Sequence, residues 1–205
     1  MSHGWHQGIF LAVVVVVTTG CGPGSVNGSP GSAGSGGWSS FPVPIYADAS
    51  ILSNSQTQQD FMDAMAFWEG KAGKKLFDYK GQWAGGTPYQ GDASNPTGAN
   101  ANVIFFQNGW PFGPTIAART TTFTSGSTIQ SGIIMVNPGV NFCEGDCPNG
   151  QYKTSERNTF AHEIGHFLGL SHVNDTSNIM NPVVIPAQTL TDVKVDTVAL
   201  NSLIH

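Results

Sequence analysis

The sequence predicts an α/β fold with a mixed β-sheet, because one helix-like segment precedes a series of strand-like segments. The segment at 55–72 carries Phe61, Met65 and Trp68 on one face at helical spacing. Segments rich in β-branched and aromatic residues follow, separated by Gly, Pro, Asn and Ser, at 76–83, 102–107, 116–124 and 129–137. Strands that follow an early helix indicate an α/β layout with a mixed sheet.

Three further segments complete the predicted elements. Residues 43–47 are predicted to be extended, and Pro44 favours an edge or leading strand because proline cannot donate to a sheet ladder. Residues 158–170 are predicted to form a second helix that glycine ends, and residues 191–204 a third helix that begins at a Thr/Asp cap.

Size and composition indicate one exported domain. The chain has 205 residues, which allow one domain of ordinary size plus accessory segments. Charged residues make up 10% of the chain, whereas 26 glycines and many Ser, Thr and Asn residues supply polarity. The net charge of −5 provides no basic surface for a phosphate backbone, so we expect no nucleic-acid partner.

The N-terminus has the pattern of an export signal. The apolar run at 9–19 is too short for a membrane-spanning helix of about 20 residues and is typical of a signal peptide, which we assign to residues 1–20. The alternative is a buried Val-rich strand. The next residue, Cys21, ends a segment that resembles a bacterial lipobox, so we expect lipidation of Cys21; ordinary signal cleavage is the alternative.

Residues 21–42 are predicted to be a flexible tether. Between residues 22 and 40, fifteen of nineteen residues are Gly, Ser or Pro, too polar and too small to bury a core. The tether leaves residues 43–205 as the folded domain.

Within this domain, Cys143 and Cys147 form an even pair, which an oxidising compartment favours as a disulfide. A metal site with two thiolate ligands is the alternative, but no second ligand pair lies nearby.

A candidate metal-binding motif begins with His162, Glu163 and His166. Histidines at i and i+4 lie on one face of a helix, where both can bind one zinc ion, and Glu163 can act as general base on a water molecule. Gly169 allows a left-handed exit from the helix, after which His172 can return to the same metal. There is no histidine between residues 6 and 162, so these three are the only histidines of the domain besides the terminal His205.

The pattern His162-Glu163-x-x-His166-x-x-Gly169-x-x-His172 resembles the signature of the metzincin metallopeptidases. The segment SNIMNP at 177–182 is similar to their methionine turn, in which Met180 would pack as an apolar floor below the zinc site. The sequence AHEIGHFLGLSH and the proline two residues after Met180 are most similar to the matrixin branch, the matrix metalloproteinase type.

This resemblance implies a metzincin-type zincin: a twisted mixed sheet, two helices in the N-terminal subdomain including the zinc-binding helix, a methionine turn and a C-terminal helix. It implies one catalytic Zn²⁺ bound by His162, His166 and His172, with Glu163 as the catalytic residue, acting on a polypeptide substrate. Calcium is possible, although no clear motif supports it. Residues 116–124 could be the sheet edge that pairs with substrate, or an ordinary exposed strand, and residues 183–190 would form a pocket wall.

The resemblance and the N-terminus together predict an exported zinc endopeptidase of extracellular proteins, either a bacterial cell-envelope lipoprotein or a secreted protein. We expect a monomer that meets the membrane only through its lipid anchor. Two alternatives keep the zinc site: a tethered surface-binding module without turnover, and a zinc amidase acting on a non-protein substrate. The first would not need the general base, yet Glu163 is present.

Overall fold

The computed structural model describes residues 14–21, 36–145, 147, 154–183 and 189–204. In chain order, its elements are β1 (Val14–Cys21), β2 (Val43–Ala47), α1 (Ala49–Leu52), α2 (Ser55–Ala72), β3 (Phe77–Gln82), β4 (Tyr89–Asp92), β5 (Asn95–Ala99), β6 (Val103–Phe106), β7 (Ala118–Ser125), β8 (Thr128–Val136), β9 (Phe142–Cys143), β10 (Thr154–Ser155), α3 (Glu156–Leu168) and α4 (Thr197–Leu203). The α/β class predicted from the sequence is confirmed.

A six-stranded sheet organises the molecule, with the strand order β1-β7-β8-β6-β2-β3. Strands β8, β6, β2 and β3 run parallel to one another, whereas β7 is antiparallel to both β8 and β1. The sheet is therefore mixed, as predicted. Its antiparallel part lies at the β7 side, which is also the side next to α3.

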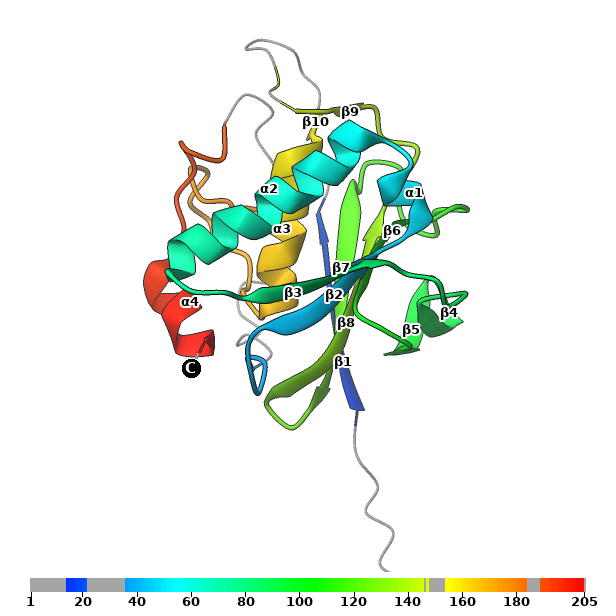
Figure 1. Ribbon diagram of the computed structural model, residues 1–205, viewed down its shortest axis with the longest axis horizontal. Helices are drawn as coiled ribbons and strands as arrows, with labels where there is room; N and C mark the ends of the chain where they lie inside the picture. The colour runs from blue at the N-terminus through cyan, green and yellow to red at the C-terminus, as the bar shows by residue number, and fades with distance from the viewer. Residues whose placement is uncertain (1–13, 22–35, 146, 148–153, 184–188, 205) are drawn as a thin grey trace, which may run out of the picture.

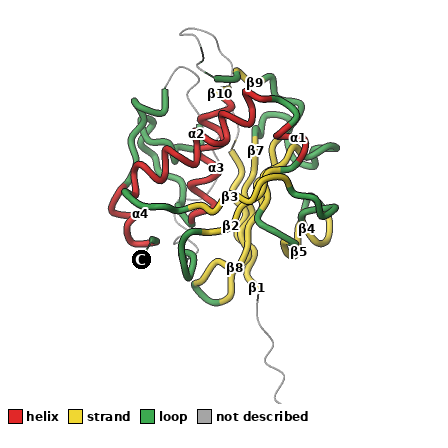
Figure 2. The backbone as a smooth tube through the Cα atoms, in the orientation of Figure 1, coloured by secondary structure: helices red, strands yellow, loops and turns green. Residues whose placement is uncertain are grey.

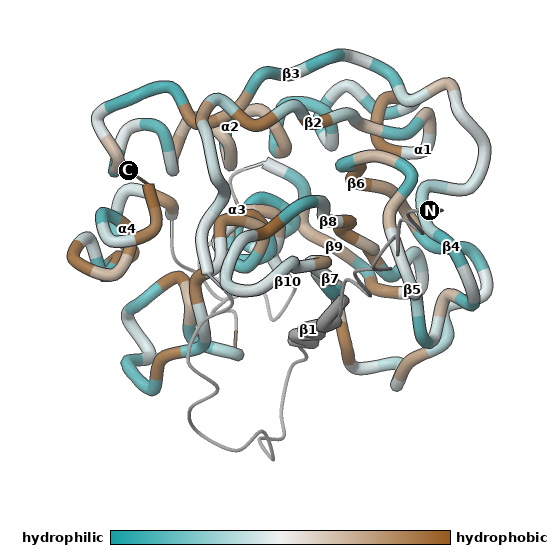
Figure 3. Tube along the Cα trace, turned by 90° about the horizontal axis from the view of Figure 1, so that it is seen from below, coloured by the Kyte–Doolittle hydropathy of each residue, from teal (hydrophilic) through white to brown (hydrophobic). Residues whose placement is uncertain are grey.

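Helices α2 and α3 pack together on one face of the sheet (Figure 1). Asn54 caps α2 by accepting from the backbone N–H groups of Gln56 and Thr57, and Gly73 ends it in the left-handed region at φ 65°. Viewed after a 90° turn, α3 lies in the interior, between the sheet on one side and α2 and α4 on the other (Figure 3). The main apolar core fills this layer.

A second, smaller core covers the opposite face of the sheet. Its buried residues are Val103, Phe105, Phe123, Ile133 and Met135. Partly buried aromatic side chains pack on it, among them Trp83, Tyr89, Trp110 and Phe112. The β4–β5 hairpin contributes to this layer and lies on the side of the sheet away from α2 and α3 (Figure 2). The sequence analysis had no prediction for this hairpin.

The N-terminal segments differ in part from the predicted signal and tether. Residues 1–13 and 22–35 lie outside the described residues. Residues Val14–Cys21 form β1, which pairs antiparallel along the whole of β7. Signal cleavage and lipidation of Cys21 stay predictions.

Residues 37 and 38, which fall within the predicted tether, pack against the folded domain. The backbone N–H of Ile129 donates to the Gly37 carbonyl at 3.1 Å. The Trp38 indole donates to the Phe167 carbonyl at 2.7 Å, and the Trp38 side chain is 8% exposed. Burial of this large apolar side chain against α3 fixes the end of the predicted tether to the domain.

The C-terminal helix is shorter than the predicted 191–204. It begins at Thr197, where the Asp196 side chain accepts from the Ala199 N–H. The preceding residues cannot be helical because their backbone groups pair elsewhere: the Lys194 N–H donates to Ser177 at 2.8 Å, and the Lys194 carbonyl accepts from Ile179 at 2.9 Å. This segment therefore forms a bridge to residues 177–179 instead of a helical turn.

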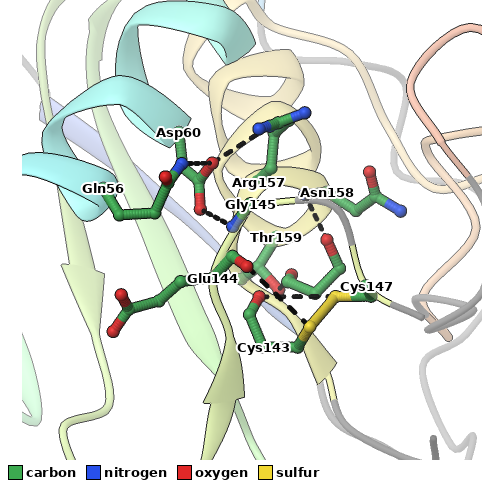
Figure 4. The surroundings of a disulfide bond; sticks show 10 residues. Gln56, Asp60, Cys143, Glu144, Gly145, Cys147, Arg157, Asn158 and Thr159 are labelled. Carbon is green, nitrogen blue, oxygen red and sulfur yellow. Dashed lines mark hydrogen bonds and ion pairs between the residues drawn. A yellow bond between two sulfur atoms is a disulfide. The ribbon is translucent and has the colours of Figure 1, made fainter.

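A disulfide between Cys143 and Cys147 lies at the N-terminal end of α3, as the sequence led us to expect (Figure 4). Inside the loop that it closes, the Gly145 N–H donates to the buried Asp60 carboxylate on α2 at 2.7 Å. The Arg157 side chain on α3 donates to the same carboxylate at 3.0 Å. Asp60 thus joins the disulfide loop, α2 and α3.

Close packing fixes α3 against its neighbours further along. The Trp68 indole on α2 donates to the Ala161 carbonyl at 2.7 Å. One turn on, Gly165 lies so near two side chains that an added Cβ would overlap Met180 and would come within 2.7 Å of the Trp68 ring. The absence of a side chain at Gly165 is therefore what lets α2 and residue 180 approach this helix.

Gly165→Ala should unfold more readily than the wild type, by roughly 1–3 kcal/mol, because the added methyl group overpacks the core. Gly70→Ala is the matched control, since Gly70 lies in α2 with open space around it. There the substitution should stabilise by up to about 1 kcal/mol through helix propensity. Denaturant titrations of the two variants should move in opposite directions, and equal shifts would refute this account of Gly165.

Glu156, the first residue of α3, should make stability fall as pH rises. Its side chain is 2% exposed, and burial, with Asp60 and Glu144 nearby, raises its pKa to about 7 from 4.5. The unfolded chain therefore ionises first, so the folded state loses stability between about pH 4.5 and pH 7 and does not regain it above.

Glu156→Gln should remove this loss, raising Tm at pH 8 by roughly 2–4 °C, about 1 kcal/mol in a domain of this size, with no gain at pH 4.5. Asp92→Asn, at an exposed position on β4, serves as the control. Thermal scans at both pH values would contradict the assignment if Glu156→Gln showed the same shift at each.

Candidate metal centre

Helix α3 and the turn after it bring three histidines together. His162 and His166 lie one turn apart, and Gly169 ends the helix at φ 107°, the left-handed exit expected from the sequence. The chain then turns back so that His172 meets both. The ring centroids are 4.6 Å apart for His162–His166, 4.6 Å for His166–His172 and 5.3 Å for His162–His172.

Backbone carbonyls fix the orientation of the two helical imidazoles. The Nδ1 atom of His162 lies 2.6 Å from the Ile179 carbonyl, and that of His166 lies 2.8 Å from the Leu170 carbonyl. A carbonyl can only accept, so each Nδ1 carries the proton and each Nε2 keeps its lone pair. Nε2 is the atom left to bind a metal.

Burial keeps these imidazoles neutral. It lowers the pKa of His162 to about 3, with a further contribution from His172. Burial first, and then the two neighbouring histidines, also lower the pKa of His166, and burial lowers that of His172. Neutral imidazole is the form that binds a metal ion, so the ligand set is ready at neutral pH.

Zinc fits this donor set. The candidate ligand atoms of the three histidines all lie within 4.8 Å of one another, and the Nε2 atoms of His166 and His172 are 3.0 Å apart. Two nitrogen ligands of a tetrahedral zinc ion, at Zn–N distances of about 2.05 Å, are roughly 3.3 Å apart. Three histidines leave a fourth position open, as in catalytic zinc sites. Within the described part of the chain, no second group of three such ligands lies this close together.

Glu163 lies beside the histidines and points toward the sheet. Its side chain is fully buried, and the Thr120 hydroxyl on β7 lies 2.6 Å from its Oε2 atom and 3.0 Å from its backbone carbonyl. A hydroxyl donor orients a carboxylate, so the contact fixes where the second oxygen of Glu163 points. Thr120 was not singled out from the sequence, where it is one of several threonines in a strand.

The predicted methionine turn lies directly against the histidine site. Met180 is 3% exposed and contacts the helix at Gly165. The Asn178 side chain accepts from the Met180 N–H at 2.9 Å, which shapes the turn and presents the Ile179 carbonyl to His162. Met180 was predicted from the sequence, whereas the role of the Ile179 carbonyl was not, because a backbone carbonyl leaves no signal in the identity of residue 179.

The other predicted site residues lie elsewhere or in part outside the described residues. The disulfide cysteines lie at the opposite end of α3 from Gly169 and the turn that carries His172. Of the predicted pocket wall at 183–190, residues 184–188 fall outside the described part. The predicted edge, 116–124, corresponds to β7, which is second from the edge because β1 lies outside it. None of the helices in the described ranges is long and apolar enough to cross a membrane.

Comparison with known families agrees with this geometry. The family model for matrixin matches residues 45–203, which begin within β2 and run to the end of α4. Comparison with curated proteins finds no match. Because the family model matches well over half of the chain and spans all three histidines, Glu163 and Met180, the chain belongs to the matrixin family of metalloproteases.

Proposed function

We propose that this protein is a zinc-dependent endopeptidase that hydrolyses internal peptide bonds of extracellular proteins. The observation that carries the proposal is the convergence of three neutral imidazoles, two of them buried, next to a buried carboxylate that a threonine orients. When bound by His162, His166 and His172, zinc would polarise the scissile carbonyl and make a water molecule more acidic.

Glu163 would act as the general base. Its carboxylate takes a proton from the attacking water and then passes that proton to the nitrogen of the leaving amine, so the carboxylate is regenerated in each cycle. The neighbouring positions in the helix support this role: Glu163 follows His162 directly, so its carboxylate lies beside the ligands without being one of them.

Thr120 would act as a positioning residue for this step. Its hydroxyl donates to one carboxylate oxygen at 2.6 Å and so fixes the orientation of the carboxylate beside the histidines. Because the threonine is on β7 and the glutamate on α3, this hydrogen bond also sets the distance between the helix and the strand along which a substrate would lie.

The pairing of β1 with β7 supports an extended substrate. Eight residues of β1 pair with β7 in antiparallel register, and this pairing supports strand addition at the outer edge of β7. Since β1 belongs to the predicted signal segment, processing of the exported chain would free this edge. A polypeptide could then bind there by strand addition, with main-chain hydrogen bonds supplying affinity.

The cellular setting remains part of the proposal. We expect an exported monomer, either anchored in a bacterial envelope through Cys21 or secreted. A surface-binding module without catalytic turnover agrees less well with the site, because such a module would not need a buried Glu163 whose carboxylate is oriented by Thr120. A zinc amidase on a non-protein substrate shares the same chemistry, and assays on polypeptides separate it from an endopeptidase.

Glu163→Gln should reduce kcat on an unfolded protein substrate by about 10²–10⁴-fold, because it removes the general base while keeping a similar shape. Zinc content should not change, since Glu163 is not a ligand; elemental analysis of the same samples checks this. A chelator should abolish wild-type cleavage and added zinc should restore it. Equal cleavage by the wild type and Glu163→Gln would refute the mechanism.

Thr120→Val should lower kcat by about tenfold with little change in KM, because a charge-assisted hydrogen bond is lost without altering side-chain volume. Thr122→Val is the matched control: Thr122 is two residues along β7 on the same face and is also buried. If both variants lose kcat to the same degree, the effect comes from strand packing, and the positioning role of Thr120 is wrong. Thr120→Ser should retain most of the wild-type kcat.

A further inference from the structure

Arg119 is a cation without an anionic partner in the described structure. It lies on β7, next to Thr120, and its guanidinium stacks over the Phe112 ring at 4.3 Å from the centroid. The Arg119 Nε atom is buried and has no hydrogen-bond partner. No carboxylate of the described residues forms an ion pair with it, whereas Lys75, Lys80 and Lys194 each form one and Arg157 forms two.

The environment of Arg119 favours an anion. Burial lowers the pKa of this guanidinium, and the negative charge of Glu163 partly opposes that effect. The guanidinium is therefore a partly desolvated positive charge. Removing a charge from water costs free energy unless an opposite charge compensates it. Glu163 compensates this half-buried cation only in part, and no carboxylate of the described residues lies at ion-pair distance from it.

The register of β7 sets the place of the missing partner. Thr120 pairs with Ile134 of the helix-side core, and its hydroxyl contacts Glu163. Arg119 pairs with Met135 of the opposite core, so its side chain lies on the other face of the same strand. On the outer side of β7, Gly20 of β1 lies opposite Arg119. Glycine has no side chain, so this cross-strand position offers Arg119 no partner.

We propose that Arg119 determines specificity by binding an acidic side chain of the substrate, on the residue that pairs opposite it along β7. The inference rests on the proposed peptidase function. Side chains directly opposite in an antiparallel pair have Cβ atoms about 4.5–5.5 Å apart, within reach of an Arg–carboxylate pair. The pairing direction of β1 further places this acidic residue immediately C-terminal to the residue opposite Thr120. The preferred Glu or Asp should therefore occur at one fixed distance from the cleaved bond.

The test uses the processed, exported protein and a peptide series in which one position at a time carries Glu, Gln or Lys around a common cleavage site. The wild type should cleave the Glu peptide about fivefold faster than the Gln peptide, in kcat/KM, at one position only. Arg119→Met, which keeps the apolar contact with Phe112, should lose this preference. Arg119→Glu should prefer Lys at the same position, and salt should weaken the wild-type preference.

Lys80→Met is the control, because Lys80 is an exposed cation on β3, at the other edge of the sheet. It should leave the Glu preference unchanged. Cleavage by the wild type without any acidic preference, or an equal preference in Arg119→Met, would overturn the role of Arg119 alone. Failure of the wild type to cleave any peptide or unfolded protein in the presence of zinc would overturn the proposed function, and this inference with it.

Discussion

The structure depends on the burial of α3. Every residue of this helix except Arg157 is buried, although the helix carries two histidines, two glutamates, an asparagine and a threonine besides its apolar residues. Buried polar groups are costly unless they form hydrogen bonds, so each must have a partner in the surrounding elements. Ile179, Leu170 and Thr120 supply partners for His162, His166 and Glu163. The hydrogen bonds that make it possible to bury these polar side chains are thus the same ones that orient the residues of the metal centre.

The two ends of α3 are fixed by different means. At its N-terminal end, Asp60 joins the disulfide loop to Arg157 through charge-assisted hydrogen bonds. At its C-terminal end, Gly169 reverses the chain and the methionine turn closes against Gly165. The first arrangement anchors the helix to α2, whereas the second brings in a histidine and a carbonyl. The matrixin signature describes only the second arrangement, because the first involves residues far apart in the chain.

The sequence was sufficient wherever one helix or one turn determines the geometry. The spacing of His162 and His166, the exit at Gly169 and the span of α2 follow from local periodicity and glycine, and the structure has them as predicted. Thr120 and the Ile179 carbonyl could not be predicted, because they reach the site through pairing between distant segments. Residues 191–196 were wrongly predicted to be helical for a related reason: Lys194 pairs with residues of the methionine turn, and this tertiary pairing outweighs a local cap signal.

Strand β7 links these observations, because adjacent residues of a strand point to opposite faces of the sheet. Thr120 faces the helix layer and contacts the proposed general base, while Arg119 faces the aromatic layer and stacks on Phe112. A substrate strand along the outer edge of β7 would present alternate side chains to these same two layers. Residues that face α3 would then meet the reacting groups, and residues that face the aromatic layer would meet Arg119. A substitution on the aromatic face of β7, such as at Arg119, would therefore change substrate preference without displacing Thr120 on the helix face. Catalysis and substrate preference can in this way vary independently along one strand.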